Sequence, residues 1–200
     1  KGGYAHFMAK EIMEQPEAVR KTISPRIRDG RVVLDDLHLT AEYVRDLSRI
    51  YVIACGSSYH VGVAAKYTLE RLLRIPVEVT LASEFRYCDP IVTRRTLAIV
   101  NVVGSSIARE ADDVLYTGAG PEIAVATTKA YTTQLVLMDL VGLYLADLLG
   151  TVEQSEYDTI LSEMQLLPEK MRQFLSHTED IQYYASRYFN HDSIFFIGRN

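Results

Sequence analysis

The chain has 200 residues, of which 48% are hydrophobic and 24% charged, and a formal net charge of −5. This balance is typical of a globular domain with a substantial core and excludes an extended disordered chain. No nucleic-acid surface is expected, because the 21 Lys and Arg residues are dispersed rather than gathered in a basic stripe. No membrane partner is expected either, because we find no apolar run of the ~20 residues that a span needs.

Cysteine and histidine usage gives no sign of a metal site. Cys55 and Cys88 are too few for a disulfide framework and lack metal spacing. We interpret both as reduced thiols of a cytoplasmic protein, with a reactive Cys55 as the alternative. The five histidines are scattered without ligand spacing, so no metal is predicted.

Residues 1–48 read as an N-terminal helical segment. Apolar side chains on one stripe predict a helix over 5–23, broken or restarted at Pro16. Ser24-Pro25 ends this helix, and a polar turn follows at 28–31. Thr40 has the position of an N-cap for a short helix that reaches about Leu47.

Residues 49–150 alternate short apolar strands with helices. Strands are predicted at 50–54, 76–81, 96–102 and 113–117, and helices at 56–73, 83–87, 107–110 and 127–149. This order indicates an α/β lobe with an open parallel sheet flanked by helices, similar to a Rossmann fold. Ligands of such sheets lie beyond the C-terminal ends of the strands.

The last fifty residues continue with helices and end in an apolar stretch. Residues 151–190 predict two amphipathic helices, the first interrupted at Pro168, that link the lobe to a further unit. The stretch 191–200 is an apolar strand running into a glycine turn, and it resembles residues 49–57. We therefore expect it to be the first strand of a second, truncated lobe.

The turn Cys55-Gly56-Ser57-Ser58 is the first candidate site. It joins an apolar strand to a helix, so free backbone N–H groups and two hydroxyls converge where the helix dipole favours an anion. A tight connection without a ligand is the equally weighted alternative. The spacing to Gly62 does not give the dinucleotide fingerprint, and no Gly-Lys-Ser/Thr of a P-loop follows.

The second candidate site is the glycine-rich segment 118–129, which leads from a strand into the longest helix. Thr127 and Thr128 either bind a ligand or simply cap that helix, and capping is the simpler interpretation. Lys129 has two open partners at this point, a phosphate or Glu122.

Four separated motifs follow one another along the chain. They are Ile53–Tyr59, Glu78-Val79 with Ala82–Tyr87, Ala98–Asp112, and Gly120–Gln134. Together they resemble the isomerase part of glutamine–fructose-6-phosphate aminotransferases, and the likeness covers nearly the whole chain. The resemblance implies sugar isomerase (SIS) lobes, two in tandem after a glutaminase domain.

The resemblance also implies an activity and a pocket. In the family, ammonia from glutamine converts fructose 6-phosphate to glucosamine 6-phosphate in a cytoplasmic homodimer, without metal or organic cofactor. The turn Gly56-Ser57-Ser58 would contact the sugar phosphate, and Val125 and Thr127 would line the same pocket. No catalytic residue of the family falls on this chain, so it is expected to bind at most.

One unit of the family pattern is absent. Family members carry a further strand, a Ser-Gln-Ser-Gly-Glu-Thr turn and a helix at the place where Thr93 meets Arg94 here. The abrupt joint fits either of two alternatives: the unit was deleted from the protein, or the protein has the unit and the sequence lacks it. The alternative function is a non-catalytic, sugar-phosphate-sensing SIS domain of a transcription regulator. Such regulators usually carry a helix-turn-helix segment ahead of the lobe, and none precedes residue 50.

Overall fold

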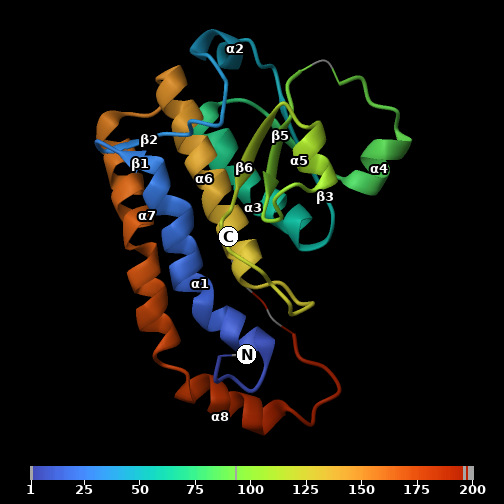
Figure 1. Ribbon diagram of the computed structural model, residues 1–200, viewed down its shortest axis with the longest axis vertical. Coiled ribbons are helices and arrows are strands. Elements are labelled where there is room, and N and C mark those ends of the chain that lie inside the picture. The colour runs from blue at the N-terminus through green and yellow to red at the C-terminus, as the bar shows by residue number, and fades with distance from the viewer. Residues whose placement is uncertain (1, 93, 196, 198–200) are drawn as a thin grey trace.

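The computed structural model describes residues 2–92, 94–195 and 197. Helices and short parallel strands alternate through its middle, with long helices at both ends (Figure 1). The elements in chain order are α1 (Phe7–Ile23), a 3₁₀ turn (Ser24–Arg26), β1 (Ile27–Arg28), β2 (Arg31–Val32), α2 (Ala41–Arg45), β3 (Ile50–Ala54), α3 (Gly56–Leu73), β4 (Val77–Leu81), α4 (Ala82–Tyr87), β5 (Leu97–Val100), α5 (Ser106–Glu110), β6 (Asp113–Tyr116), α6 (Lys129–Leu149), α7 (Gln154–Leu175) and α8 (Glu179–Tyr188).

Helix α1 runs without a break, so the interruption predicted at Pro16 is wrong. Proline has no N–H, and it therefore leaves the carbonyl of Ile12 without its usual helical partner. The side-chain Nε2 of Gln15 donates to that carbonyl oxygen at 3.1 Å and replaces the missing bond. Helix α7 likewise continues through Pro168, which is buried, so the interruption expected there does not occur either.

β1 and β2 form a short antiparallel pair. The other four strands form two separate parallel pairs instead of one sheet. β3 pairs with β4 from Ile50↔Val77 to Ala54↔Leu81, and β5 pairs with β6 from Leu97↔Asp113 to Val100↔Tyr116. Within the described residues no ladder joins the two pairs. The parallel α/β architecture is thus confirmed, while the single continuous sheet predicted from the sequence is divided in two.

A layer of helices covers one side of these strands. α3 packs against β3, β4 and α6, and α1 lies between α6 and α7 (Figure 1). The core formed by this layer includes Leu72, Leu137, Leu140 and Leu143. By length and composition α6 could cross a membrane, contrary to the sequence-based expectation. Three of its leucines, Leu137, Leu140 and Leu143, have no exposed surface, so we interpret α6 as a core helix.

The C-terminal stretch is not a strand in the part that the structure describes. Residues 191–195 and 197 have no regular secondary structure, and residues 196 and 198–200 lie outside the described residues. A strand needs a neighbouring strand to satisfy its backbone hydrogen bonds. The assignment of 191–200 to a second lobe therefore stays a prediction.

Candidate functional site

The turn between β3 and α3 has the conformation expected of an anion-binding turn. Cys55 is the N-cap of the helix, and its side chain makes no capping hydrogen bond. Gly56 has φ +56°, a left-handed conformation that a residue with a Cβ adopts only at a cost of about 1–2 kcal/mol. The first turn of an α-helix has backbone N–H groups without helical partners. The site is therefore built by the backbone, and the glycine is what allows the chain to enter the helix in this way.

The two serines of this turn are half-buried and differ in their partners. Ser58 Oγ donates a hydrogen bond of 2.9 Å to Oε1 of Gln134, on the second turn of α6. This bond joins the N-terminal end of α3 to the N-terminal part of α6. Ser57 lies one residue earlier, and no hydrogen bond of its hydroxyl is found among the described residues. The turn thus presents one engaged hydroxyl and one hydroxyl open to a ligand.

The segment between β6 and α6, which we call the β6–α6 loop (residues 117–128), is shaped by Glu122. The carboxylate of Glu122 accepts hydrogen bonds from the hydroxyl of Thr127, from the N–H of Thr128 at 2.7 Å and from the N–H of Ala130 at 3.3 Å. Burial by itself would raise the pKa of Glu122, but these hydrogen bonds outweigh it and the pKa is lowered. The predicted threonine cap is therefore only half correct. Thr128 has the N-cap position, yet the side chain that caps the helix is Glu122.

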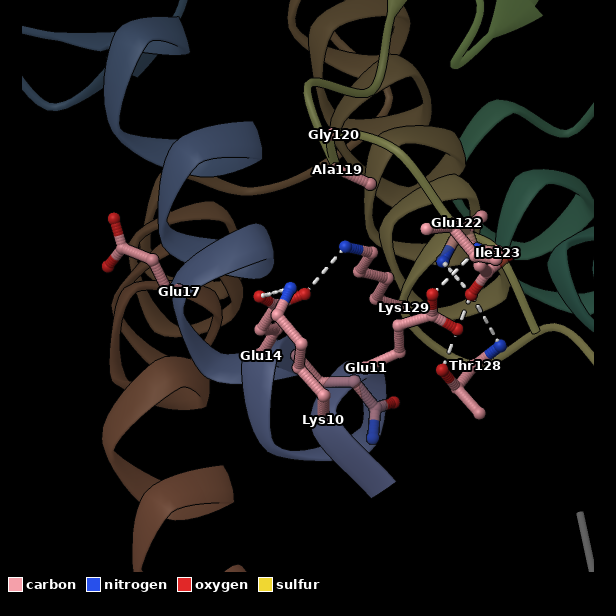
Figure 2. Close-up of polar contacts among 12 residues, drawn as sticks. Lys10, Glu11, Glu14, Glu17, Ala119, Gly120, Glu122, Ile123, Thr128 and Lys129 are labelled. Carbon is pink, nitrogen blue, oxygen red and sulfur yellow. Dashed lines mark hydrogen bonds and ion pairs between the residues drawn. The ribbon is translucent and has the colours of Figure 1, made fainter. Parts of the chain in front are cut away.

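The loop is also held from the N-terminal helix, by a residue that sequence reasoning missed. Glu11 of α1 is only 1% exposed, and its Oε1 accepts from the N–H of Ile123 at 2.6 Å (Figure 2). Its Oε2 accepts from the N–H of Ala124 at 3.2 Å. The available signal was helical spacing, because Glu11 lies on the same face of α1 as Ala18 and Thr22, both of which are buried.

Lys129 pairs with neither of the partners left open by the sequence. Its side chain is nearly fully buried, and Nζ lies 2.7 Å from Oε2 of Glu14 on α1 (Figure 2). Lys10 is the second cation on the same carboxylate, and hydrogen bonds from Lys10 and Lys129 lower the pKa of Glu14. The first residue of α6 is thus fixed to α1 by an ion pair.

The predicted pocket residues differ in how far the structure brings them together. Val125 is fully exposed at the tip of the β6–α6 loop, and Thr127 is bonded to Glu122. Within the described residues no hydrogen bond joins this loop to the turn at 55–58. Two shallow surface hollows are lined by residues in and next to α2, such as Thr40 and Tyr43, and by residues of α1 and α7. Neither includes a predicted site residue.

The pattern of the SIS domain matches the chain in two pieces, residues 43–100 and 92–144. The chain belongs to the SIS domain family. All of it aligns with part of the glutamine–fructose-6-phosphate aminotransferase of Clostridium acetobutylicum, with 46% identity over 38% of that protein. The corresponding enzyme of Caldanaerobacter subterraneus gives the same identity and coverage. The family resemblance drawn from the four motifs is thereby confirmed.

Solved structures support the fold of this SIS domain. The C-terminal domain of glucosamine-fructose-6-phosphate aminotransferase from Francisella tularensis superposes with a TM-score of 0.87 and 32% identity. The superposition covers 95% of this chain and 61% of the other. The chain thus spans about two fifths of the length of the curated relatives and part of their isomerase domain.

The alignments with relatives are longer than the chain itself. The alignment with the Clostridium protein runs over 228 positions, whereas this chain has 200 residues, so at least 28 positions of the alignment face no residue here. The two pieces of the SIS match overlap at 92–100, a stretch that contains the joint between Thr93 and Arg94. A match in two pieces is expected of a chain that lacks an internal part of the family pattern.

Proposed function

We propose that this SIS domain supplies part of the sugar-phosphate pocket of an aminotransferase. The whole enzyme would convert fructose 6-phosphate and glutamine-derived ammonia to glucosamine 6-phosphate. The proposal rests on the alignment of this whole chain with one part, 38%, of each of two such enzymes. The partners proposed with it are a glutaminase domain, a second SIS lobe and a second copy of the protein, all in the cytoplasm. Residues 49–150 would be the binding lobe, with 1–48 and 151–190 as its helical flanks.

The turn at 55–58 is the proposed phosphate contact. Its backbone N–H groups lie at the N-terminus of an 18-residue helix, and the partial positive charge of such an end favours an anion. Ser57 and Ser58 would add hydroxyl donors. Ser58 would have to exchange the neutral amide oxygen of Gln134 for a phosphate oxygen, and the hydrogen bond to the charged acceptor is the stronger one.

The β6–α6 loop would form the opposite wall through Val125 and Thr127. Glu11 holds the backbone of this loop at Ile123, and Glu122 holds it at Thr128, so the wall is positioned before any ligand arrives. This chain would bind and orient the sugar phosphate, while ring opening and isomerisation would be carried out by the rest of the enzyme. The assignment of the phosphate contact within this pocket depends most on the conformation of the turn, in which Gly56 enters α3 at φ +56°.

A titration of the 200-residue chain with fructose 6-phosphate, followed by two-dimensional NMR, tests this assignment. We expect the amide signals of 56–59 and 123–128 to shift, because a phosphate would approach these N–H groups. Replacing both serines (Ser57→Ala with Ser58→Ala) removes two donors to a charged group, so affinity should fall by about 1–3 kcal/mol.

Ser162→Ala is the matched control, because its hydroxyl lies on the exposed face of α7 and bonds only to a backbone carbonyl of its own helix. An affinity that is unchanged in the double variant would remove the turn from the site. Signal shifts confined to other parts of the chain would contradict the proposed pocket as a whole.

A further inference from the structure

The turn at 55–58 and the β6–α6 loop each lead into one of two helices that pack side by side. α3 begins at Gly56, directly after Cys55, and α6 begins directly after the loop. The contacts between α3 and α6 follow the same order along both helices, because Ser58 meets Gln134 near the start and Leu72 lies against Gly142 further along. The two helices therefore run in the same direction, and the turn and the loop lie at the same end of the pair.

Gln134 projects from a part of α6 that is fixed to α1. Lys129, at the start of α6, pairs with Glu14 at 2.7 Å. Thr132 Oγ1 donates a hydrogen bond of 2.6 Å to Oε1 of Gln15, which also lies on α1. The backbone that carries Gln134 is thus held on both of the preceding turns, and rotation of the side chain is its main remaining freedom.

The side-chain amide of Gln134 uses one of its two polar ends. Oε1 accepts from Ser58 Oγ at 2.9 Å, whereas no hydrogen bond of Nε2 is found within residues 2–92, 94–195 and 197. The last torsion of a glutamine side chain is broad and roughly two-fold. The amide can therefore turn by half a rotation and present Nε2 where Oε1 lies in the free chain.

The hydrogen bond of Ser58 in the free chain conflicts with phosphate binding. A serine hydroxyl has one proton to donate and two lone pairs that accept. Ser58 gives its proton to Gln134, so the same proton is not available to a phosphate oxygen. If the proton turned to phosphate while the amide stayed in place, Oε1 would face a lone pair of Oγ. Two acceptors without a proton between them are unfavourable where both side chains are half-buried.

We propose that Gln134 is a positioning residue of the phosphate site and that its amide exchanges acceptor for donor when the site fills. In the free chain, Oε1 accepts from Ser58. In the bound chain the amide has turned, so Nε2 donates to Ser58 Oγ while the hydroxyl of Ser58 donates to the phosphate. The result is a chain of hydrogen bonds from α6 to the ligand in which each bond polarises the next. This inference rests on the phosphate contact proposed for the turn.

The side-chain amide signals of Gln134 report this exchange directly. In the two-dimensional NMR spectrum of the 200-residue chain they are identified by their loss in Gln134→Met. During titration with fructose 6-phosphate, one of the two Nε2 protons should shift downfield, because it becomes hydrogen-bonded. The shift should be absent in Ser58→Ala, which has no Oγ to accept. The side-chain signals of Gln165, exposed on α7, should not move in either chain.

Gln134→Glu measures the effect of the exchange on affinity. A carboxylate accepts from Ser58 but has no proton to donate, so it holds the hydroxyl in its free-chain orientation. Binding of fructose 6-phosphate should weaken by about tenfold or more. In the Ser58→Ala background only repulsion between carboxylate and phosphate remains, and the loss should be clearly smaller. Gln165→Glu is the matched control, because it adds the same charge on the exposed face of α7 and should leave affinity unchanged.

The outcomes distinguish this inference from the proposed function. If the backbone amide signals of 56–59 do not move in the unaltered chain, the phosphate contact and the role of Gln134 are both overturned. If those signals move while the side-chain amide of Gln134 does not, the role of Gln134 alone is overturned. Equal losses from Gln134→Glu with and without the hydroxyl of Ser58 would show a purely structural role. Tighter binding in Gln134→Met would show that Gln134 only competes with phosphate, and it would overturn the inference as well.

Discussion

The two faces of strand β3 differ in how closely other parts of the chain pack against them. Val52 faces α3 so closely that Gly62 has no room for a side chain, whereas Tyr51 and Ile53 on the other face are about half exposed. The helical layer of α1, α3, α6 and α7 packs as a finished core, while the strands beneath it lack a neighbour and a cover. The difference shows that the helical layer covers only one face of β3, and that the apolar side chains on the other face lack a cover in this chain.

Two substitutions that shorten a side chain test this difference between the covered and the uncovered face most directly. Leu140→Ala removes a side chain with no exposed surface from the core of α6 and should reduce the free energy of unfolding by about 2–5 kcal/mol. Ile53→Ala on the uncovered face should change it by less than about 1 kcal/mol. Urea denaturation of both variants measures the contrast. Equal losses would mean that the face of Ile53 is covered in solution.

Asp139, at the interface between α3 and α6, makes the stability of the chain depend on pH. Burial raises the pKa of this carboxyl from 3.8 to about 6, although a hydrogen bond from Thr68 lowers it in part. Because the folded state holds the proton more tightly, stability is highest below about pH 4. It falls as the pH rises to about 6, and above that pH the loss stays at about 3 kcal/mol.

Asp139→Asn should therefore stabilise the chain at pH 8 and flatten the dependence of the melting temperature on pH between 4 and 6. Asp147→Asn is the control on the same helix, because Asp147 is half exposed and pairs with Arg31 at the surface. If both variants behave alike across this range, the carboxyl of Asp139 is better hydrated than its packing indicates.

The smallest change in the free energy of unfolding is expected at Glu11, which joins the helical layer to the β6–α6 loop. Glu11→Ala leaves the N–H groups of Ile123 and Ala124 without their acceptor, and it should lower the free energy of unfolding by about 1–3 kcal/mol. Amide exchange should quicken first at these two residues. Glu17→Ala, which removes an exposed partner of Arg20 on the same helix, should change neither quantity. A slow exchange at Ile123 in the Glu11→Ala variant would contradict the assigned role of Glu11.

Local signals predicted most of the elements, and the predictions that failed have both local and distant causes. The β-branched run before Cys55 and the hydroxyl of Thr40, which accepts from Tyr43, gave β3 and α2 correctly. The predicted break at Pro16 failed because the neighbouring Gln15 replaces the lost bond.

The partners of Glu11 and Lys129 could not be predicted from the sequence, for a different reason. Glu11 bonds to residues more than a hundred positions away, and Lys129 meets Glu14 at a similar separation. No local pattern records such pairs. The candidate site was therefore predicted as two separate segments, and the helix that fixes one of them was not.

The contacts of Glu11 and Glu14 determine how much of the N-terminal segment a fragment of this lobe must include. The SIS pattern begins at residue 43, and a gene fragment starting there would keep both matched pieces, 43–100 and 92–144. Its β6–α6 loop would nevertheless lose Glu11, which accepts from the N–H groups of Ile123 and Ala124. The buried ammonium of Lys129 would also lose its counterion, Glu14. The stretch of chain that identifies the family is therefore shorter than the stretch that must be expressed together for its binding loop to keep its shape.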